Sequence, residues 1–144
     1  MIRSAVPKTL AALAVATFAI AAAAHASPST DLARAHIKDV ASGDLAKINA
    51  QYTPASWLNW VGGPLNGSYQ GADAIAGVWS KFTKQGPLKV AVHEVTENAN
   101  PAGSTVTANV IFHGKTAIKV HYVMLYRAGK LIDETWQIDP KLKN

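Results

Sequence analysis

The stretch from Thr116 to Asp139 constrains the fold more than any other part of the sequence. Its two arms are rich in β-branched and aromatic residues, a composition typical of strands. They are separated by a turn from Arg127 to Lys130, in which Gly129 can take the positive φ that a tight hairpin needs. The sequence therefore predicts a long β-hairpin, and its apolar side chains require cover from the rest of the chain.

Side chains alternate between the two faces of a strand, and this alternation sorts the hairpin into an apolar face and a mixed face. On the first arm the apolar face carries Ile118, Val120, Tyr122, Met124 and Tyr126, and the mixed face carries Lys119, His121, Val123, Leu125 and Arg127. On the returning arm one face carries Ile132, Glu134, Trp136 and Ile138. A carboxylate among three apolar groups has to be paired or lose its charge, so Glu134 is a candidate functional residue.

The first 26 residues have the three parts of a secretory signal peptide. Arg3 and Lys8 form a basic start, an apolar run extends from Leu10 to Ala24, and Ala24-His25-Ala26 is a small-x-small cleavage site. The run is shorter than the roughly 20 residues that a helix needs to cross a bilayer, which argues against a membrane anchor. We expect export to the bacterial periplasm or the medium, with no membrane contact after cleavage.

Removal of 26 of the 144 residues leaves 118, which suffices for a single domain at 27–144 with one core. Loss of Arg3 and Lys8 leaves 12 basic against 9 acidic side chains, a net charge of +3. The basic residues are spread along the chain without a cluster interleaved with aromatics, so we expect no nucleic-acid partner. The sequence has no cysteine, so packing alone has to stabilise the exported protein.

Helices are expected in the first part of this domain. Ser29-Thr30-Asp31 has the chemistry of a helix cap, and an apolar stripe at three- and four-residue spacing follows as far as Gly43. His36 lies in that stripe between Leu32 and Val40, which places its imidazole on the buried face.

A short second helix and a third complete the helical part. The second is capped by Asp44 and extends to Tyr52, and the third spans 72–82. A short strand at 56–60 and a glycine-rich, irregular loop at 61–71 lie between them, and such a loop is often the rim or lid of a site. Strands follow at 88–96 and 104–112 and in the final hairpin, so the sequence predicts an α+β domain.

Three groups of residues resemble the nuclear transport factor 2-like (NTF2-like) superfamily, which includes ketosteroid isomerases and SnoaL-like polyketide cyclases. They are Gly43-Asp44-Leu45 within the run 35–52, the later Gly71, Ile75 and Trp79 at four-residue spacing, and the final Gly129-Lys130-Leu131-Ile132. The resemblance covers nearly all of 27–144. It implies a cone in which a curved, mixed or antiparallel sheet wraps around three N-terminal helices and encloses a deep cavity.

Matched position by position, the working residues of the isomerases are all changed. The family's oxyanion-binding tyrosine falls on His36, its aspartate base on Trp60 and its protonated aspartate on Tyr122, while a pocket-lining apolar position falls on Glu134. Without a carboxylate at position 60 the isomerase proton shuttle lacks its base. The resemblance therefore does not carry the isomerase activity over.

The cavity that the resemblance implies would have a chemistry of its own. The candidate catalytic residues are His36, Glu134 and Tyr122, with His36 and Glu134 pointing into one cavity and coupled there. The candidate ligand-binding residues are Trp57, Trp60, Trp79, Tyr122, Met124 and Trp136. Two plainer interpretations stay open: a buried neutral His36 hydrogen-bonded to Tyr122 or to a carbonyl, and Trp57 and Trp79 as core residues.

No motif points to a metal or a cofactor. His93, His113 and His121 fall on different strands and do not converge at the spacing that zinc needs. Gly62-Gly63 is followed by Pro64 rather than by a helix, so no phosphate-binding loop is indicated. We expect neither a metal nor a cofactor.

Two classes of function follow from these residues. The first is an exported small-molecule-binding domain whose cavity holds an apolar or aromatic molecule. The second is a cofactor-independent enzyme of the isomerase, dehydratase or cyclase type, in which His36 or Glu134 transfers a proton on a carbonyl compound. A sealed cavity with these two residues paired would favour neither class and would indicate a structural or assembly role.

The outer face of the hairpin predicts self-association. Val123 and Leu125, with Val95 or Ile111 beside them, would expose an apolar patch on a monomer, and such patches usually mark interfaces. We expect a homodimer formed through the sheet.

The first testable prediction concerns export. Because a basic start, an apolar run and a small-x-small site occur together, the exported protein should begin at Ser27. Intact-mass analysis of protein from the periplasm of a bacterial host checks this, and a mass that still includes residues 1–26 would contradict it.

Overall fold

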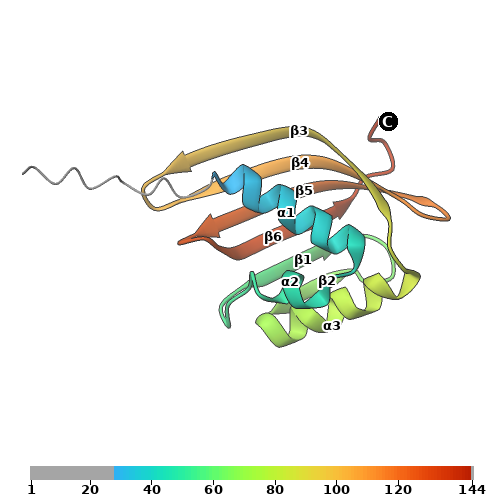
Figure 1. The fold of residues 1–144 in the computed structure, drawn as a ribbon, viewed down its shortest axis with the longest axis horizontal. Helices are drawn as coiled ribbons and strands as arrows, with labels where there is room; N and C mark the ends of the chain where they lie inside the picture. The colour runs from blue at the N-terminus through green and yellow to red at the C-terminus, as the bar shows by residue number, and fades with distance from the viewer. Residues whose placement is uncertain (1–27, 144) are drawn as a thin grey trace, which may run out of the picture.

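The computed structural model describes residues 28–143, so the predicted signal peptide at 1–26 lies outside the described residues. The helices are α1 (Ser29–Ser42), α2 (Leu45–Asn49) and α3 (Ala72–Phe82), and the short 3-10 helix η1 (Thr83–Gln85) follows α3 directly. The strands are β1 (Trp57–Val61), β2 (Gly67–Gln70), β3 (Lys89–Asn100), β4 (Gly103–His113), β5 (Ala117–Arg127) and β6 (Lys130–Ile138). Three helices and one sheet confirm the predicted α+β class (Figure 1).

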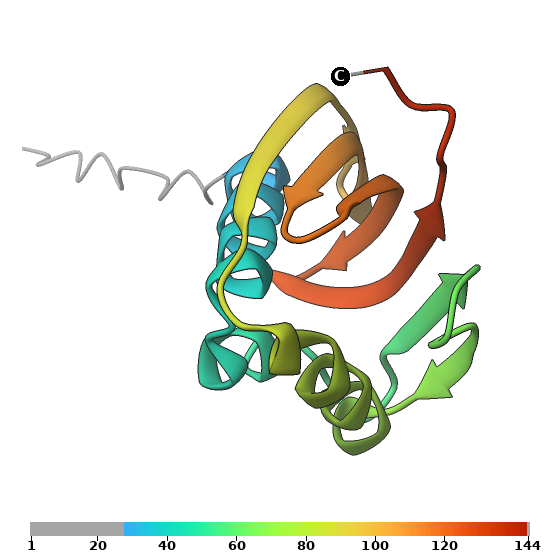
Figure 2. The same ribbon diagram turned by 90° about the vertical axis from the view of Figure 1, so that its right-hand side faces the viewer.

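The six strands form one mixed sheet in the order β2-β1-β6-β5-β4-β3. Every neighbouring pair is antiparallel except β1 and β6, which run parallel. The sheet is strongly curved, with the helices along one side of it (Figure 2), and it stays open because β2 and β3 are free edges. This is the curved, mixed sheet around N-terminal helices that the resemblance implied.

The N-terminus of helix α1 is capped by a carboxylate from another element of the fold. Glu97 of β3 accepts hydrogen bonds from the backbone N–H groups of Ser29 (3.2 Å) and Thr30 (2.9 Å) and from the Thr30 hydroxyl (2.6 Å). These hydrogen bonds from Thr30 and Ser29 lower the pKa of Glu97, as expected for an anion at a helix N-terminus. The expected cap by Ser29-Thr30-Asp31 is therefore wrong, because these residues form the first turn and Glu97 caps them.

The end of α1 and the start of α2 follow the prediction. Gly43 has a φ of 77° and donates its N–H to the carbonyl of Asp39 at 3.0 Å, which ends α1. Asp44 then accepts a hydrogen bond from the backbone of Lys47 at 3.2 Å and caps α2. The second helix is shorter than predicted, however, because it ends at Asn49 and the chain turns before Tyr52.

The glycine-rich segment after β1 is more regular than predicted. Gly62 and Gly63, with φ of 96° and 69°, let the chain reverse within a few residues. The strand β2 then returns antiparallel to β1, with Leu58 opposite Tyr69. The expected irregular loop at 61–71 is thus wrong in part, because its second half extends the edge of the sheet.

A bulge in β6 changes which side chains of the final hairpin face inward. Leu125 pairs with Asp133 and Tyr126 pairs with Leu131, so Ile132 is the extra residue. Leu131 is fully buried in the core and Ile132 is only half buried. The prediction that Ile132 shares the inner face with Glu134 is wrong for this reason, whereas Glu134 and Trp136 do face inward, fully buried.

The core lies between the concave face of the sheet and the helices. The apolar stripes of α1 and α3 supply Ala33, Ile37, Val40, Ile75, Val78, Trp79 and Phe82, and the inner face of β5 supplies Val120, Tyr122, Met124 and Tyr126. At its centre Trp136 stacks on Trp60 (ring centroids 4.8 Å apart) and on Phe112 (5.0 Å), with Trp79 and Phe82 edge-on to it. We call these five residues the aromatic layer.

Among residues 28–143, no helix has the length and apolar character that crossing a membrane requires.

Candidate functional site

Five side chains from five separate segments meet in the interior of the domain. His36 comes from α1, Tyr52 from the turn after α2, Trp79 from α3, Tyr122 from β5 and Glu134 from β6. All five are buried, and His36 and Glu134 have no exposed surface at all. We call them the buried polar cluster.

Glu134 is the acceptor at the centre of this cluster. Its Oε1 accepts the hydroxyl of Tyr52 and its Oε2 accepts the hydroxyl of Tyr122. The Nε2 of His36 lies 3.3 Å from Oε2 of Glu134, which brings together the pair that the sequence predicted to be coupled. The indole N–H of Trp79 donates to the hydroxyl oxygen of Tyr52 at 2.7 Å.

The position of the proton on His36 follows from this network. Tyr122 uses its only O–H to donate to Glu134, so the oxygen of Tyr122 can only accept from the histidine ring. The Nε2 of His36, 2.9 Å from that oxygen, therefore carries the proton, an assignment made from hydrogen-bond partners. The Nδ1 of His36 is buried and has no hydrogen-bond partner among the described residues.

The tyrosines of the interior are held in their neutral form. Burial, followed by the negative charge of Glu134, raises the pKa of Tyr52 and of Tyr122 well above the usual value for a phenol. Burial and Glu134 likewise raise the pKa of Tyr126, whose hydroxyl contacts the sulfur of Met124. Neutral phenols keep the O–H groups that satisfy the carboxylate of Glu134.

Tyr52 is the member of the cluster that sequence reasoning missed. The segment 44–52 predicts a helix in which Leu45 and Ile48 point inward, and the same three- and four-residue spacing places Tyr52 on their face. Tyr52 is buried in the structure although α2 ends at Asn49. The signals available in the sequence were therefore this spacing and the presence of an unpaired inner-face carboxylate, Glu134, to which a tyrosine can donate.

A pocket of about 650 Å³ opens at the end of the sheet where β1, β5 and the C-terminal segment meet. Its apolar lining comes from Trp60, Pro64, Leu65, Phe82, Ala117, Ile118, Ile138 and Pro140, and its polar lining from Lys81, Gln85 and Lys119. No member of the buried polar cluster lines it. Trp60 and Phe82, which do, pack on Trp136 and Trp79, so the aromatic layer lies between the pocket and the polar groups of the cluster. Trp79 belongs to both groups, because its ring packs in the layer and its indole N–H donates to Tyr52.

The structure distributes the six residues predicted to bind a ligand among three places. Trp60 lines the pocket, while Trp79, Tyr122, Met124 and Trp136 are fully buried behind it. Trp57 lies on the outer face of β1 and is 38% exposed. The single cavity expected to hold all of these residues together with His36 and Glu134 is therefore divided, with an apolar pocket on one side of the aromatic layer and a packed cluster on the other.

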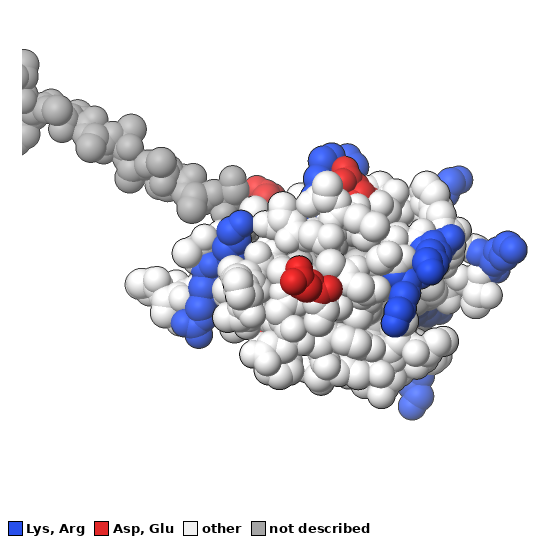
Figure 3. All heavy atoms as spheres, turned by 90° about the horizontal axis from the view of Figure 1, so that it is seen from below, with Lys and Arg blue, Asp and Glu red and all other residues white. Residues whose placement is uncertain are grey.

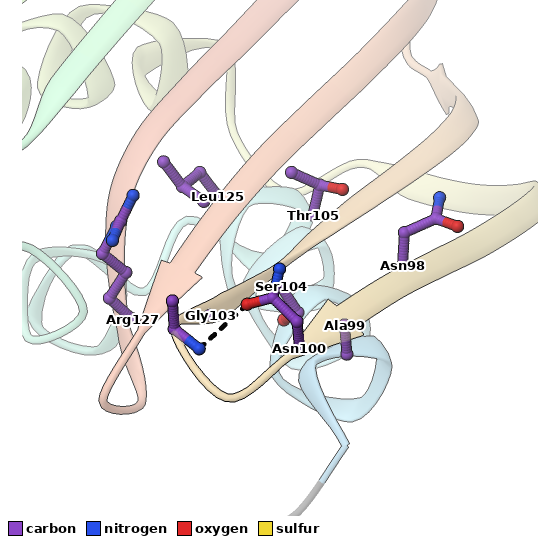
Figure 4. A pocket seen from close by; sticks show the side chains of 9 residues that line it. Asn98, Ala99, Asn100, Gly103, Ser104, Thr105, Leu125 and Arg127 are labelled. Atoms are coloured by element: carbon purple, nitrogen blue, oxygen red, sulfur yellow. Dashed lines mark hydrogen bonds between the residues drawn. The ribbon is translucent and has the colours of Figure 1, made fainter.

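A second hollow, of about 270 Å³, lies near the turn between β3 and β4 (Figure 4). Asn98, Asn100 and Thr105 line it from β3 and β4, and Leu125 and Arg127 line it from β5. The amide of Asn100 is already used, because its Oδ1 accepts the N–H of Ala102 at 2.9 Å. None of the predicted site residues borders this hollow.

The surface charge is sparse. On the face shown in Figure 3, lysine and arginine side chains lie in separate groups with wide uncharged areas between them. Within residues 28–143 there is no group of three or more histidine, aspartate or glutamate side chains placed to hold a metal ion.

Comparisons with known proteins identify the fold. No protein-family model matches the chain, and no curated protein matches it significantly. Solved structures do match: an NTF2-like protein of unknown function from Pseudomonas putida has a TM-score of 0.66 at 16% identity, over 81% of this chain and 96% of that one. A protein of unknown function with a cystatin-like fold from Nostoc punctiforme has a TM-score of 0.66 at 14% identity, over 79% and 90% of the two chains.

A designed protein shares the same architecture. A de novo designed protein with a curved β-sheet has a TM-score of 0.58 at 19% identity, over 78% of this chain and 86% of that one. The chain therefore has the NTF2-like, cystatin-like fold that its sequence resembles. Because the identities are low and a designed protein is among the matches, the likeness shows the fold, and function has to be argued from the site.

The raised pKa values predict a loss of stability in alkali. Unfolding returns Tyr52, Tyr122 and Tyr126 to a pKa of about 10, whereas in the folded protein they stay protonated well above that pH. The contribution of the three neutral tyrosines to stability is therefore fully present below about pH 10. Above that pH, each tyrosine should lower the free energy of unfolding by about 1.4 kcal/mol per pH unit. Urea unfolding at pH 9, 10 and 11 measures this slope.

The variant Tyr126→Phe serves as the comparison protein for this slope. The hydroxyl that it removes contacts only the sulfur of Met124 in the hydrogen-bond network. The variant should keep the fold and show a slope about one third smaller above pH 10. A wild-type unfolding free energy that stays constant from pH 9 to pH 11 would contradict the neutral state of these phenols.

Proposed function

We propose that the chain is an exported small-molecule-binding domain that holds an apolar or aromatic molecule in the pocket beside Trp60 and Phe82. The observation that carries this proposal is the pocket itself, whose volume of about 650 Å³ falls in the range of ligand sites in proteins. Its wall is mainly aliphatic and aromatic, with a few polar groups at Lys81, Gln85 and Lys119. Predominantly apolar walls with few polar groups are the usual composition of such sites.

The rigidity of the pocket floor supports binding. Trp60 and Phe82 are almost fully buried and are fixed by contacts with Trp79 and Trp136. Binding on such a surface costs little side-chain entropy of the protein, because these rings are already ordered before the ligand arrives. The small areas of these two rings that stay exposed are aromatic, which favours a flat or aromatic molecule.

The enzymatic alternative has less support. Proton transfer by His36 or Glu134 requires contact with the reacting atoms, and both side chains are fully buried behind the aromatic layer. Both oxygens of Glu134 are occupied by the phenols of Tyr52 and Tyr122. We infer that the buried polar cluster holds the helices on the sheet, and that binding takes place on the other side of the aromatic layer.

Retention of small molecules tests the binding function. The purified protein is incubated with a mixture of apolar and aromatic compounds, and the retained compounds are identified by native mass spectrometry. Ala117 lines the pocket at the exposed start of β5, so Ala117→Trp should fill the pocket without disturbing the core and should reduce retention at least about tenfold.

The control is Ala55→Trp, which adds the same ring at an exposed position that does not line the pocket. It should retain ligands as the wild type does. Absence of any retained compound, or equal retention by Ala117→Trp, would refute the proposed function.

We also infer that two copies associate through the outer face of the sheet. Trp57, Asp133 and Leu125 are neighbours across β1, β6 and β5, and Val123 lies two residues from Leu125 on the same face. Burial, followed by the charge of Glu134, raises the pKa of Asp133, the acidic residue between Trp57 and Leu125 on this face. Ile111 and Val95 add little exposed area, because Ile111 is buried and Val95 packs against the core.

The oligomeric state tests this association. Aromatic residues at the centre of an interface carry a large share of its binding energy, so Trp57→Lys should weaken the dimer strongly and Trp57→Phe should weaken it less. Light scattering at micromolar concentration gives the mass of each protein. A monomeric wild type would contradict the inference, as would a Trp57→Lys variant that stays dimeric.

A further inference from the structure

The charges around the pocket are of one sign. Among its lining residues the charged side chains are Lys81, in the last turn of α3, and Lys119, near the start of β5; no aspartate or glutamate lines it. Within residues 28–143 the ion pairs are Lys47 with Asp44 and His36 with Glu134, so neither pocket lysine is neutralised by a carboxylate. The pocket therefore combines apolar walls with a positive rim.

Lys119 is held in place by the C-terminal segment. Its Nζ donates to the carbonyl of Leu142 at 2.7 Å, and its own carbonyl accepts the N–H of Asp139 at 2.8 Å. An ammonium group has three protons, so this contact leaves two for a ligand. Lys119 is half buried, which strengthens its interaction with an anion relative to a lysine in open solvent.

One acidic residue adjoins the pocket lining in sequence but does not itself line the pocket. Asp139 stands between Ile138 and Pro140, which both line the pocket, and its Oδ1 accepts the backbone N–H of Lys141 at 3.0 Å. Lys81 is exposed and can turn toward the mouth of the pocket, where it adds a second positive charge. A ligand with a negative group at that end would meet two cations and no competing anion in the lining.

We propose that the ligand is an apolar or aromatic carboxylic acid. Its hydrocarbon part lies on Trp60 and Phe82, and its carboxylate lies at the rim beside Lys119 and Lys81. This proposal rests on the binding function proposed above and adds the charge of the ligand to it. A small inorganic anion would leave the apolar walls unused, and an amphiphilic cation would be repelled by both lysines.

Three probes with the same ring system separate charge from apolar contact. They are 2-naphthoate, 2-naphthylmethanol and 2-naphthylmethylammonium, which carry a negative, a neutral and a positive group, and their affinities are measured by isothermal titration calorimetry. The acid should bind about three- to tenfold more tightly than the alcohol, as expected for one or two partly exposed charge contacts, and the amine most weakly. Raising the salt concentration should narrow the difference between acid and alcohol.

Lysine variants assign the effect to the rim. Lys119→Met and Lys81→Met keep most of the aliphatic length and remove the charge, so each should reduce the preference for the acid about two- to fivefold and leave the alcohol unchanged. Lys84→Met is the matched control, because Lys84 lies in η1 and does not line the pocket. It should bind all three probes as the wild type does.

The outcomes distinguish the two proposals. Equal binding of the acid and the alcohol by the wild type overturns the carboxylate inference and leaves the pocket as an apolar site. A preference for the acid that survives in both Lys119→Met and Lys81→Met also overturns it. If none of the three probes binds, the carboxylate inference is overturned, whereas the binding function is decided separately by the retention experiment with the compound mixture.

Discussion

The carboxylate of Glu134 has to be satisfied inside the core, and much of the contact between helices and sheet follows from the way this is done. Its two oxygens take hydrogen bonds from Tyr52 and Tyr122, and His36 stands beside them. Removing one partner from a buried charged group typically costs several kcal/mol, far more than an exposed ion pair contributes. The cluster therefore fixes one arrangement of α1, the turn after α2 and the sheet, because any other leaves a buried charge without partners.

The aromatic layer then sets which part of the interior stays open. In many sites a polar cluster and an apolar wall share one cavity, but here Trp60, Trp136 and Phe112 are stacked between them and fill the interior of the cone. What stays open is the end of the sheet, where β1, β5 and the C-terminal segment leave the pocket lined by Trp60 and Phe82. In the proposed function, recognition takes place in an apolar pocket with a positive rim, and the buried polar cluster holds the helices on the sheet.

The parts of this arrangement that depend on local pattern could be predicted from the sequence. Alternation placed Tyr122, Met124 and Trp136 on the inner face, and helical periodicity placed His36 on the buried face of α1. The pairing of His36 with Glu134 followed from those two patterns together. The α+β class could be predicted because the helical patterns come first in the sequence and most of the strand patterns follow them, with turn residues between the strands.

Other features depend on contacts between distant segments, and no local pattern specifies them. The bulge at Ile132 moves one residue of β6 to the opposite face, which strict alternation cannot anticipate. Glu97 caps α1 across 67 residues of sequence, and the hydroxyl of Tyr52 reaches Glu134 across 82. The extent of the pocket depends on how closely Trp60 and Trp136 stack, which is a matter of three-dimensional packing rather than of residue type.

The parallel pairing of β1 with β6 has a consequence for the order in which the chain can acquire its structure. The strand β1 is joined to β3, β4 and β5 only through β6, the last strand of the chain. Tyr52 and His36 likewise have their partner, Glu134, on that strand. Contacts between residues so far apart in sequence form late and slowly, because a long loop has to close before they are gained. Until its C-terminus has emerged, the growing chain lacks the element that joins its two halves. The two halves therefore come together only at the end of synthesis, which is compatible with the export proposed for the chain.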